Sequence, residues 1–267
     1  MNTAEVEALF ARALVGDYEA DDAWEAVFAL QRDGSREIFE HAAEWCIAGD
    51  PLKRARGADL LAQLRRAPAP GEEQDPRNTE SMFRAEAYAL ITKMLEKEQD
   101  CLVLDSAIKG LGHLRDPSAA PLILRYQDHP DGDVRFAVAF ALGCFPNDAQ
   151  SVRGLLKLTS DSDADVRDWA VFGLGVLGDV DSPEIREALF RCLDDASQNV
   201  REEAAVGLAK RQDQRLIPKL LEMLDEPGLT IRLAEATADL LGLDKDPPDW
   251  TAADYKAALK KRFQIPE

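Results

Sequence analysis

The sequence has few of the residues from which catalytic and metal centres are built. Histidine occurs three times and cysteine four times in 267 residues, and no C-x-x-C pair or other metal-ligand spacing joins them: His41, His113, His129, Cys46, Cys101, Cys144 and Cys192. The nucleophile motif G-x-S-x-G and the phosphate-binding loops are missing in their required strand-to-helix setting. We therefore expect no catalytic residue, no metal and no cofactor, and we expect four free thiols.

Basic residues are scarce relative to acidic ones. There are 50 Asp and Glu against 32 Lys and Arg, which gives a formal net charge of −18 at pH 7. Such a surface repels phosphate groups, so it disfavours nucleic acid and anionic membranes as partners and favours a basic protein. The same charge also serves to keep an extended surface soluble, and the sequence leaves both interpretations open.

Long apolar runs are absent as well. No uninterrupted apolar stretch approaches the roughly 20 residues that span a membrane. The first residues, MNTAEVEALFARALVGD, lack the basic start and apolar centre of a signal peptide. Hydrophobic residues nevertheless make up 46% of the chain, which is enough for a packed core. These features predict a cytoplasmic protein.

The chain is made of repeated segments. Three of them align as DGDVRFAVAFALG (131–143), DADVRDWAVFGLG (163–175) and SQNVREEAAVGLA (197–209), and their Val-Arg pairs are 32 and 34 residues apart. A second helical pattern lies ahead of each copy, as in VRGLLKLTSD (152–161) and EIREALFRCLDD (184–195), with apolar residues at three- and four-residue spacing. No segment has the alternation of a strand. The sequence therefore predicts an all-α protein built from helix pairs.

The residues of this unit resemble the HEAT repeat, in the short form found in phycobilin lyases. The shared pattern is an Asp, then Val-Arg, then Ala, and Leu-Gly at the close. The resemblance implies a right-handed α-α superhelix, that is, one solenoid domain over residues 1–267 with about seven helix pairs and a C-terminal capping helix. The resemblance to the HEAT repeat is clearest over residues 116–242 and fainter at residue 66 and below. We place an inserted loop at 67–81 and the capping helix at 251–263, beginning at the N-cap Thr251.

Several repeated polar residues are expected to serve the fold. Arg135, Arg167 and Arg201 occupy equivalent places and should form a ladder with acids of neighbouring repeats. Asp133 and Asp165 should cap the second helices and join that ladder. Glycines near the helix ends should terminate the helices through left-handed caps: Gly112, Gly143, Gly175 and Gly242.

The helical wheel separates core from surface positions. Counting from the arginine as zero, positions −1, +3, +4 and +7 form an apolar stripe, which for the repeat at Arg167 is Val166, Ala170, Val171 and Leu174. Positions +1, +2 and +5 lie on the opposite side, and we call them the second-helix face. From the HEAT resemblance we expect this face to line a concave groove. On the last second helix, Glu235 and Asp239 are expected to form a solvated face.

Aromatic residues gather on the second-helix face of two adjacent repeats, and acids border them. An apolar patch rimmed with charge is typical of a binding site. The candidate partner-binding residues are Phe136, Phe140, Asp168, Trp169, Phe172, Glu202 and Glu203. Packing of Phe136 and Phe172 against each other is the competing explanation, and for Trp24 and Phe28 packing is the preferred one.

The sequence thus predicts a non-enzymatic, protein-binding HEAT-like scaffold with an acidic groove and an aromatic centre. Its partner would be a basic protein whose Arg or Lys stacks on Trp169. A scaffold, an assembly factor and an antitoxin-like inhibitor all fit this description. One alternative is a bilin lyase-like or chaperone-type protein that holds a small hydrophobic ligand. A remote alternative, a HEAT-like DNA glycosylase, is opposed by the acidic charge. The oligomeric state is left open.

Overall fold

The structure, a computed structural model, describes residues 1–65, 81–243 and 249–266. Across these ranges the chain is helical, and its β pairing is one isolated bridge between Arg65 and Ser81. This agrees with the expected all-α class. The inserted loop placed at 67–81 lies, apart from Ser81, outside the described residues. None of the described helices combines the length and the apolar character that a membrane crossing requires.

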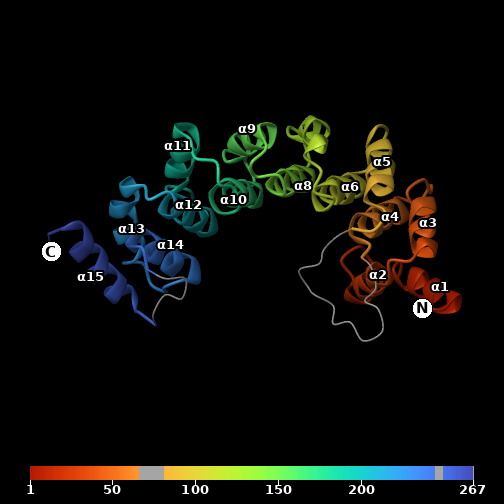
Figure 1. Cartoon of the computed structure of the whole chain (residues 1–267), viewed down its shortest axis with the longest axis horizontal. Helices are drawn as coiled ribbons and strands as arrows, with labels where there is room; N and C mark the ends of the chain where they lie inside the picture. The colour runs from red at the N-terminus through yellow and green to blue at the C-terminus, as the bar shows by residue number, and fades with distance from the viewer. Residues whose placement is uncertain (66–80, 244–248, 267) are drawn as a thin grey trace. The chain divides into compact units, whose positions relative to one another are not determined.

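The chain divides into two compact units, Met1–Cys144 and Phe145–Glu267, which we describe separately. In both, consecutive helices form pairs (Figure 1). The helices of the N-terminal unit are α1 (Thr3–Arg12), α2 (Asp21–Asp33), α3 (Arg36–Trp45), α4 (Pro51–Gln63), α5 (Arg84–Leu95), α6 (Cys101–His113), α7 (Ala120–Ile123) and α8 (Gly132–Gly143). Those of the C-terminal unit are α9 (Ala149–Leu158), α10 (Ala164–Phe172), α11 (Pro183–Cys192), α12 (Gln198–Lys210), α13 (Ile217–Met223), α14 (Ile231–Leu241) and α15 (Ala252–Phe263).

The second helices of successive pairs pack side by side within each unit. In the N-terminal unit α6 lies between α4 and α8, and in the C-terminal unit α12 lies between α10 and α14. The apolar stripe predicted from the wheel is buried, with Val166, Ala170 and Val171 at 0% exposure and Leu174 at 1%. The core positions of this repeat are therefore confirmed.

Each second helix from α4 onward begins at a polar N-cap, but α8 and α10 do not begin at the acids we expected. Asp131 accepts a hydrogen bond from the backbone N–H of Asp133 at 2.9 Å, and Asp163 accepts one from Asp165 at 2.8 Å. The expectation that Asp133 and Asp165 are the caps is wrong by two residues. Both lie in the first turn, where their charge still interacts favourably with the helix dipole.

The arginine ladder is present. Arg167 on α10 donates through Nε and Nη2 to the carboxylate of Asp195, at 2.7 and 2.8 Å, and through Nη1 to two carbonyl oxygens in the turn before its helix. Arg201 on α12 repeats the pattern and reaches Glu226 at 3.5 Å. These arginines tie each second helix to the turn of the following repeat, so a structural role is confirmed for them.

The glycines serve close packing more than helix termination. Gly242 alone among the four expected caps has a positive φ, +70°. Gly112, Gly143 and Gly175 are buried in right-handed backbone. A Cβ on Gly207 of α12 would lie 2.7 Å from the Cα of Gly175, so the two backbone segments approach more closely than any side chain permits. The expectation of left-handed caps is wrong at those three positions, and at Gly112 and Gly175 close contact with a neighbouring helix is what requires the glycine.

Candidate functional site

The seven candidate residues are divided between the two units. Phe136 and Phe140 lie on α8 of the N-terminal unit. The other five lie in the C-terminal unit, on α10 and α12: Asp168, Trp169, Phe172, Glu202 and Glu203. All the aromatic members are half-buried. Their role in binding a partner stays a prediction.

In the C-terminal unit an internal guanidinium sits beside the aromatic residues. The rings of Trp169 and Phe172 meet edge to face, with centroids 5.5 Å apart. Arg232 lies in the first turn of α14. Its guanidinium is 5.6 Å from the ring centroid of Phe172. Its Nε is 2.8 Å from Oε1 of Glu203, and its Nη1 donates to Glu235 at 3.1 Å. This surface therefore already holds a cation of the kind we expected a partner to supply.

Glu202 and Glu203 are buried, at 6% and 8% exposure, although the wheel placed them on a solvent-facing surface. Glu202 accepts hydrogen bonds from Gln198 and from the hydroxyl of Thr230, both at 2.8 Å. The expectation of exposure is wrong because α12 lies between two neighbouring helices. Side chains from α14 and from its N-cap cover the positions that a single helix would leave open.

Two carboxylate oxygens in this cluster are buried without a hydrogen-bond partner. They are Oδ1 of Asp168 on α10 and Oε2 of Glu203 on α12. Burial raises the pKa of Glu203 to about 7; Arg232 opposes the shift, and Asp168, Glu235 and Glu202 reinforce it. Burial and then the nearby Asp165 likewise raise the pKa of Asp168. Negative charge is thus incompletely compensated here.

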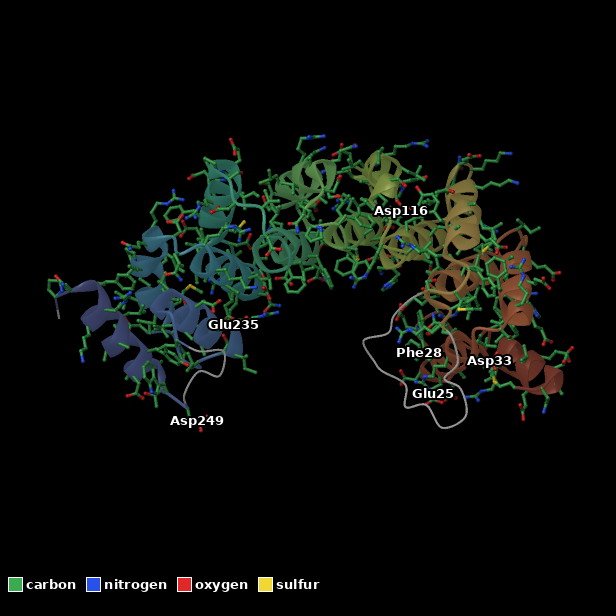
Figure 2. All side chains as sticks on the ribbon, viewed as in Figure 1. Glu25, Phe28, Asp33, Asp116, Glu235 and Asp249 are labelled. Atoms are coloured by element: carbon green, nitrogen blue, oxygen red, sulfur yellow. The ribbon has the colours of Figure 1, made fainter. Side chains whose placement is uncertain are left out.

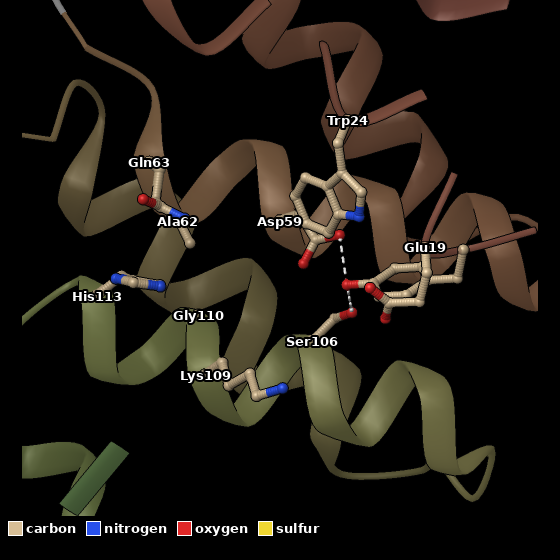
Figure 3. A pocket seen from close by; sticks show the side chains of 10 residues that line it. Glu19, Trp24, Asp59, Ala62, Gln63, Ser106, Lys109, Gly110 and His113 are labelled. Atoms are coloured by element: carbon tan, nitrogen blue, oxygen red, sulfur yellow. Dashed lines mark hydrogen bonds between the residues drawn. The ribbon is translucent and has the colours of Figure 1, made fainter. Parts of the chain in front are cut away.

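A pocket of about 180 Å³ opens on the second-helix face of the N-terminal unit (Figure 3). It lies between α2, α4 and α6, and the loop before α2 contributes to its wall. The sequence did not indicate this pocket, because the loop residues that close it carry no repeat signature. Its main lining residues are Tyr18, Glu19, Trp24, Asp59, Ser106 and Lys109.

A fully buried arginine supports the wall of this pocket. The guanidinium of Arg56 lies against both aromatic rings, 4.3 Å from the centroid of Tyr18 and 4.4 Å from that of Trp24, and the two rings meet edge to face with centroids 5.5 Å apart. Its Nε and Nη2 donate to the carbonyl oxygens of Ala13 and Tyr18, and Nη1 lies 3.7 Å from Oδ2 of Asp59. Trp24 therefore has a packing role, in keeping with the preferred explanation for this residue.

The floor of the pocket is a hydrogen-bonded chain of side chains. The hydroxyl of Tyr18 donates to Oδ2 of Asp59 at 2.9 Å, and it lies 2.9 Å from the hydroxyl of Ser106 (Figure 3). Burial raises the pKa of Asp59 to about 7, although the bonds from Tyr18 and the charge of Arg56 oppose this shift. The pocket is accordingly polar and has one weakly compensated carboxyl group at its base.

A third cation lies between a carboxylate and an aromatic ring on α6 and α8. The ammonium of Lys109 is 2.8 Å from Oδ1 of Asp105 and 5.1 Å from the ring centroid of Phe136. The ring of Phe140 contacts His113 edge to face at 5.1 Å. Both candidate phenylalanines of the N-terminal unit therefore pack on side chains of α6, and their half-exposed faces form part of the same surface.

Metal and thiol chemistry find no geometric support in the described part of the chain. No group of three or more His, Cys, Asp or Glu in it is arranged to hold a metal ion. Cys46 and Cys192 are buried, and burial raises the pKa values of their thiols to about 12 and about 11. A thiol with so high a pKa remains protonated and unreactive at neutral pH.

Comparison with known families identifies the architecture. Residues 88–175 and 152–241 match the family model of HEAT repeats. Together these stretches cover more than half of the chain, so the protein belongs to the HEAT-repeat family, as the repeat pattern predicted.

Individual relatives support the same fold. The sequence is similar to protein YibA of Escherichia coli strain K12, with 25% identity over 217 residues, 79% of this chain and 72% of YibA. The X-ray structure of Escherichia coli YibA is similar over 100% of this chain and 93% of that one, with a TM-score of 0.69 and 20% identity. An engineered protein covers 97% of this chain, and 72% of its own length, with a TM-score of 0.55 and 15% identity. These likenesses show the fold, and the fold alone does not define a function.

Proposed function

We propose that this protein is a non-enzymatic HEAT-repeat scaffold whose second-helix faces bind a basic protein. The N-caps define these faces on every second helix from α4 onward, because the zero position follows the cap by four residues. The cap Thr230 therefore places Glu235 and Asp239 at positions +1 and +5 of α14, and Glu235 projects from that helix in Figure 2.

The observation that carries the proposal is an excess of carboxylates at these positions. Two of the residues there are basic, Arg56 and Lys109. Seven are acidic: Asp59, Asp105, Asp168, Glu202, Glu203, Glu235 and Asp239.

The raised pKa values of most of these acids indicate that their negative charge is poorly stabilised by the surrounding residues. Burial raises the pKa of five of the seven: Asp59, Asp105, Asp168, Glu203 and Asp239. When burial raises the pKa of a carboxyl group, its ionised form is stabilised by a cation that binds beside it. Basic side chains of a partner would supply that charge, and the half-buried rings of Trp169 and Phe172 would supply apolar contact.

The alternative of a small-ligand holder is less well supported. The pocket beside Tyr18 has a volume of about 180 Å³, below the range of about 300–1,000 Å³ usual for pockets that enclose drug-sized molecules. Its lining carries Asp59, Ser106 and Lys109, which suit water or a polar side chain better than a tetrapyrrole.

Affinity capture from the native host tests the proposal. The immobilised protein should retain a basic protein, and the complex should dissociate as the salt concentration rises, because surface charges are screened beyond about 8 Å at physiological salt. The proposal would be contradicted if the immobilised protein recovered an acidic protein, or if nucleic acid remained bound to it after washing at moderate salt. The recovered partner should then bind in purified form with the same salt dependence.

A further inference from the structure

The two unpartnered carboxylate oxygens of the C-terminal unit point to a specific ligand. We propose that Asp168 Oδ1 on α10 and Glu203 Oε2 on α12 form a receptor for an arginine guanidinium of the bound protein, beside the internal Arg232. This inference rests on the proposed function and names the group that the protein recognises.

Leaving these two oxygens unpaired costs free energy. Both are out of contact with water and accept no hydrogen bond from the described residues. A buried acceptor without a donor costs about 1–3 kcal/mol, and more when it is charged, so such atoms are rare in native proteins. They come from adjacent helices that pack together, and the charge of Asp168 is one of those that act on Glu203. A ligand with two donors would satisfy both.

Arg232 already places one guanidinium in this cluster. Its guanidinium stacks on Phe172 and pairs with Oε1 of Glu203, and this leaves Oε2 available. The site therefore accommodates one planar cation between carboxylate and ring already. A guanidinium has five N–H donors in one plane, so a second one can bridge two carboxylates while it stacks on the neighbouring Trp169. An ammonium group would satisfy the charge but would not stack in this way.

A metal ion is not the occupant that this geometry favours. Ions such as Ca²⁺ need six or more oxygen ligands, and the described residues contain no cluster of three or more ligating side chains. Because the two oxygens are occluded, the side chains that cover them must shift when the guanidinium enters. Arg232, whose side chain is 38% exposed, and the half-buried Trp169 are the residues that we expect to move.

Binding should release a proton. Glu203 has a pKa of about 7 and is surrounded by Asp168 on α10, Glu202 on its own helix, and Arg232 and Glu235 on α14. At pH 7 a fraction of Glu203 is therefore protonated. A bound guanidinium stabilises the carboxylate, so the carboxyl O–H bond breaks and its proton passes to the buffer.

The test uses fluorescein-labelled hexa-arginine, hexa-lysine and hexa-glutamate peptides, titrated into the intact protein and followed by anisotropy. Hexa-arginine should bind at least about fivefold tighter than hexa-lysine. Asp168→Asn should weaken hexa-arginine binding about tenfold, or about 1.4 kcal/mol, and remove the preference for arginine. Hexa-glutamate should not bind.

Glu202→Gln is the matched control. Glu202 is a neighbour of Glu203 on α12 and is equally buried, but both its oxygens already accept hydrogen bonds. Its neutralisation removes the same formal charge and should weaken binding less than about threefold. Equal losses in Asp168→Asn and Glu202→Gln would show that only overall charge attracts the peptide, which overturns the receptor while the proposed function stands. If neither basic peptide binds the wild-type protein, the proposed function fails and the receptor with it.

Calorimetry gives a second measurement that does not depend on Asp168→Asn folding well. The heat of hexa-arginine binding at pH 7 should differ between phosphate and Tris buffers because their ionisation enthalpies differ. Glu203→Gln should remove that difference. A wild-type heat that is the same in both buffers would contradict the role of Glu203.

Discussion

Arg167 and Asp195 are joined by two hydrogen bonds, of 2.7 and 2.8 Å, between helix α10 and the turn that precedes α12. Arg54 and Glu98 form the same double contact in the N-terminal unit, at 2.8 and 3.1 Å. Both pairs are largely shielded from water, with side-chain exposures between 8% and 17%. They fix the distance between consecutive repeats more firmly than apolar contacts alone would do.

Arg167→Ala should lower the free energy of unfolding by about 3 kcal/mol, measured by urea denaturation. It would leave the carboxylate of Asp195 buried without its partner, and breaking a buried ion pair costs about 3–5 kcal/mol. Lys219→Ala is the control, because Lys219 pairs with Asp194 on an exposed surface where ion pairs contribute little. Similar losses in the two variants would show that the ladder arginine has no special structural role.

Gly207→Ala should destabilise the C-terminal unit by about 2 kcal/mol, as expected for an overpacked helix contact. The added Cβ would lie 2.7 Å from the Cα of Gly175 and 3.0 Å from a methyl group of Leu189, so α12 must move away from the segment after α10. Gly49→Ala is the comparison, since nothing lies within 4 Å of a Cβ there. Thermal denaturation followed by circular dichroism measures both, and an unchanged melting temperature for Gly207→Ala would refute the tight contact.

The sequence predicted the helices and the core better than the surroundings of the polar residues. The wheel placed Val166 and Val171 in the core because a 3.6-residue period depends only on the helix itself. The same wheel placed Glu203 in solvent, and there it was wrong. Burial of that residue depends on how closely α14 packs and on how far Arg232 reaches, and a single helix carries no information on either.

The candidate residues of the C-terminal unit likewise could be predicted from the sequence only in part. Trp169 and Phe172 could be selected from the sequence because aromatic residues, which make up only 7% of the chain, gather at those repeat positions. The internal cation that accompanies them could not, because Arg232 comes from a helix two pairs further along the chain. The N-terminal pocket was missed for a related reason: Tyr18 reaches it from a loop, where no periodicity applies.

Stability should depend on pH through Glu203. Its pKa rises from an ordinary value of 4.5 to about 7 on folding, so the folded protein binds more protons than the unfolded chain between these values. Its contribution to stability is therefore present below about pH 4.5 and is lost as the pH rises through 7. Relative to Glu203→Gln, the wild-type protein should lose about 3 kcal/mol between pH 4.5 and pH 8.

Urea denaturation of both proteins at several pH values measures this difference. Asp59, whose pKa is also raised to about 7, is present in both proteins, so its contribution cancels. Parallel stability curves for wild type and Glu203→Gln would contradict the raised pKa. A curve for the wild type that rises relative to the variant would show that Arg232 dominates and that Glu203 is charged throughout.

Trp169→Ala should abolish binding of the basic partner while lowering stability by only about 1–2 kcal/mol, because the side chain is only half-buried. Its loss removes the ring on which a guanidinium would stack, and this contact contributes only when the partner is bound. Binding is measured with the partner recovered by affinity capture, and stability by urea denaturation.

Trp24→Ala provides the opposite case. Trp24 is also half-buried, but its ring covers the guanidinium of Arg56, which is fully buried and has an Nη1 without a hydrogen bond. Removing the ring should destabilise the N-terminal unit by about 3 kcal/mol or more, since the cation loses its contact on one face. If Trp169→Ala destabilised the protein as strongly as Trp24→Ala, Trp169 would be a packing residue like Trp24, and the aromatic part of the proposed binding surface would be lost.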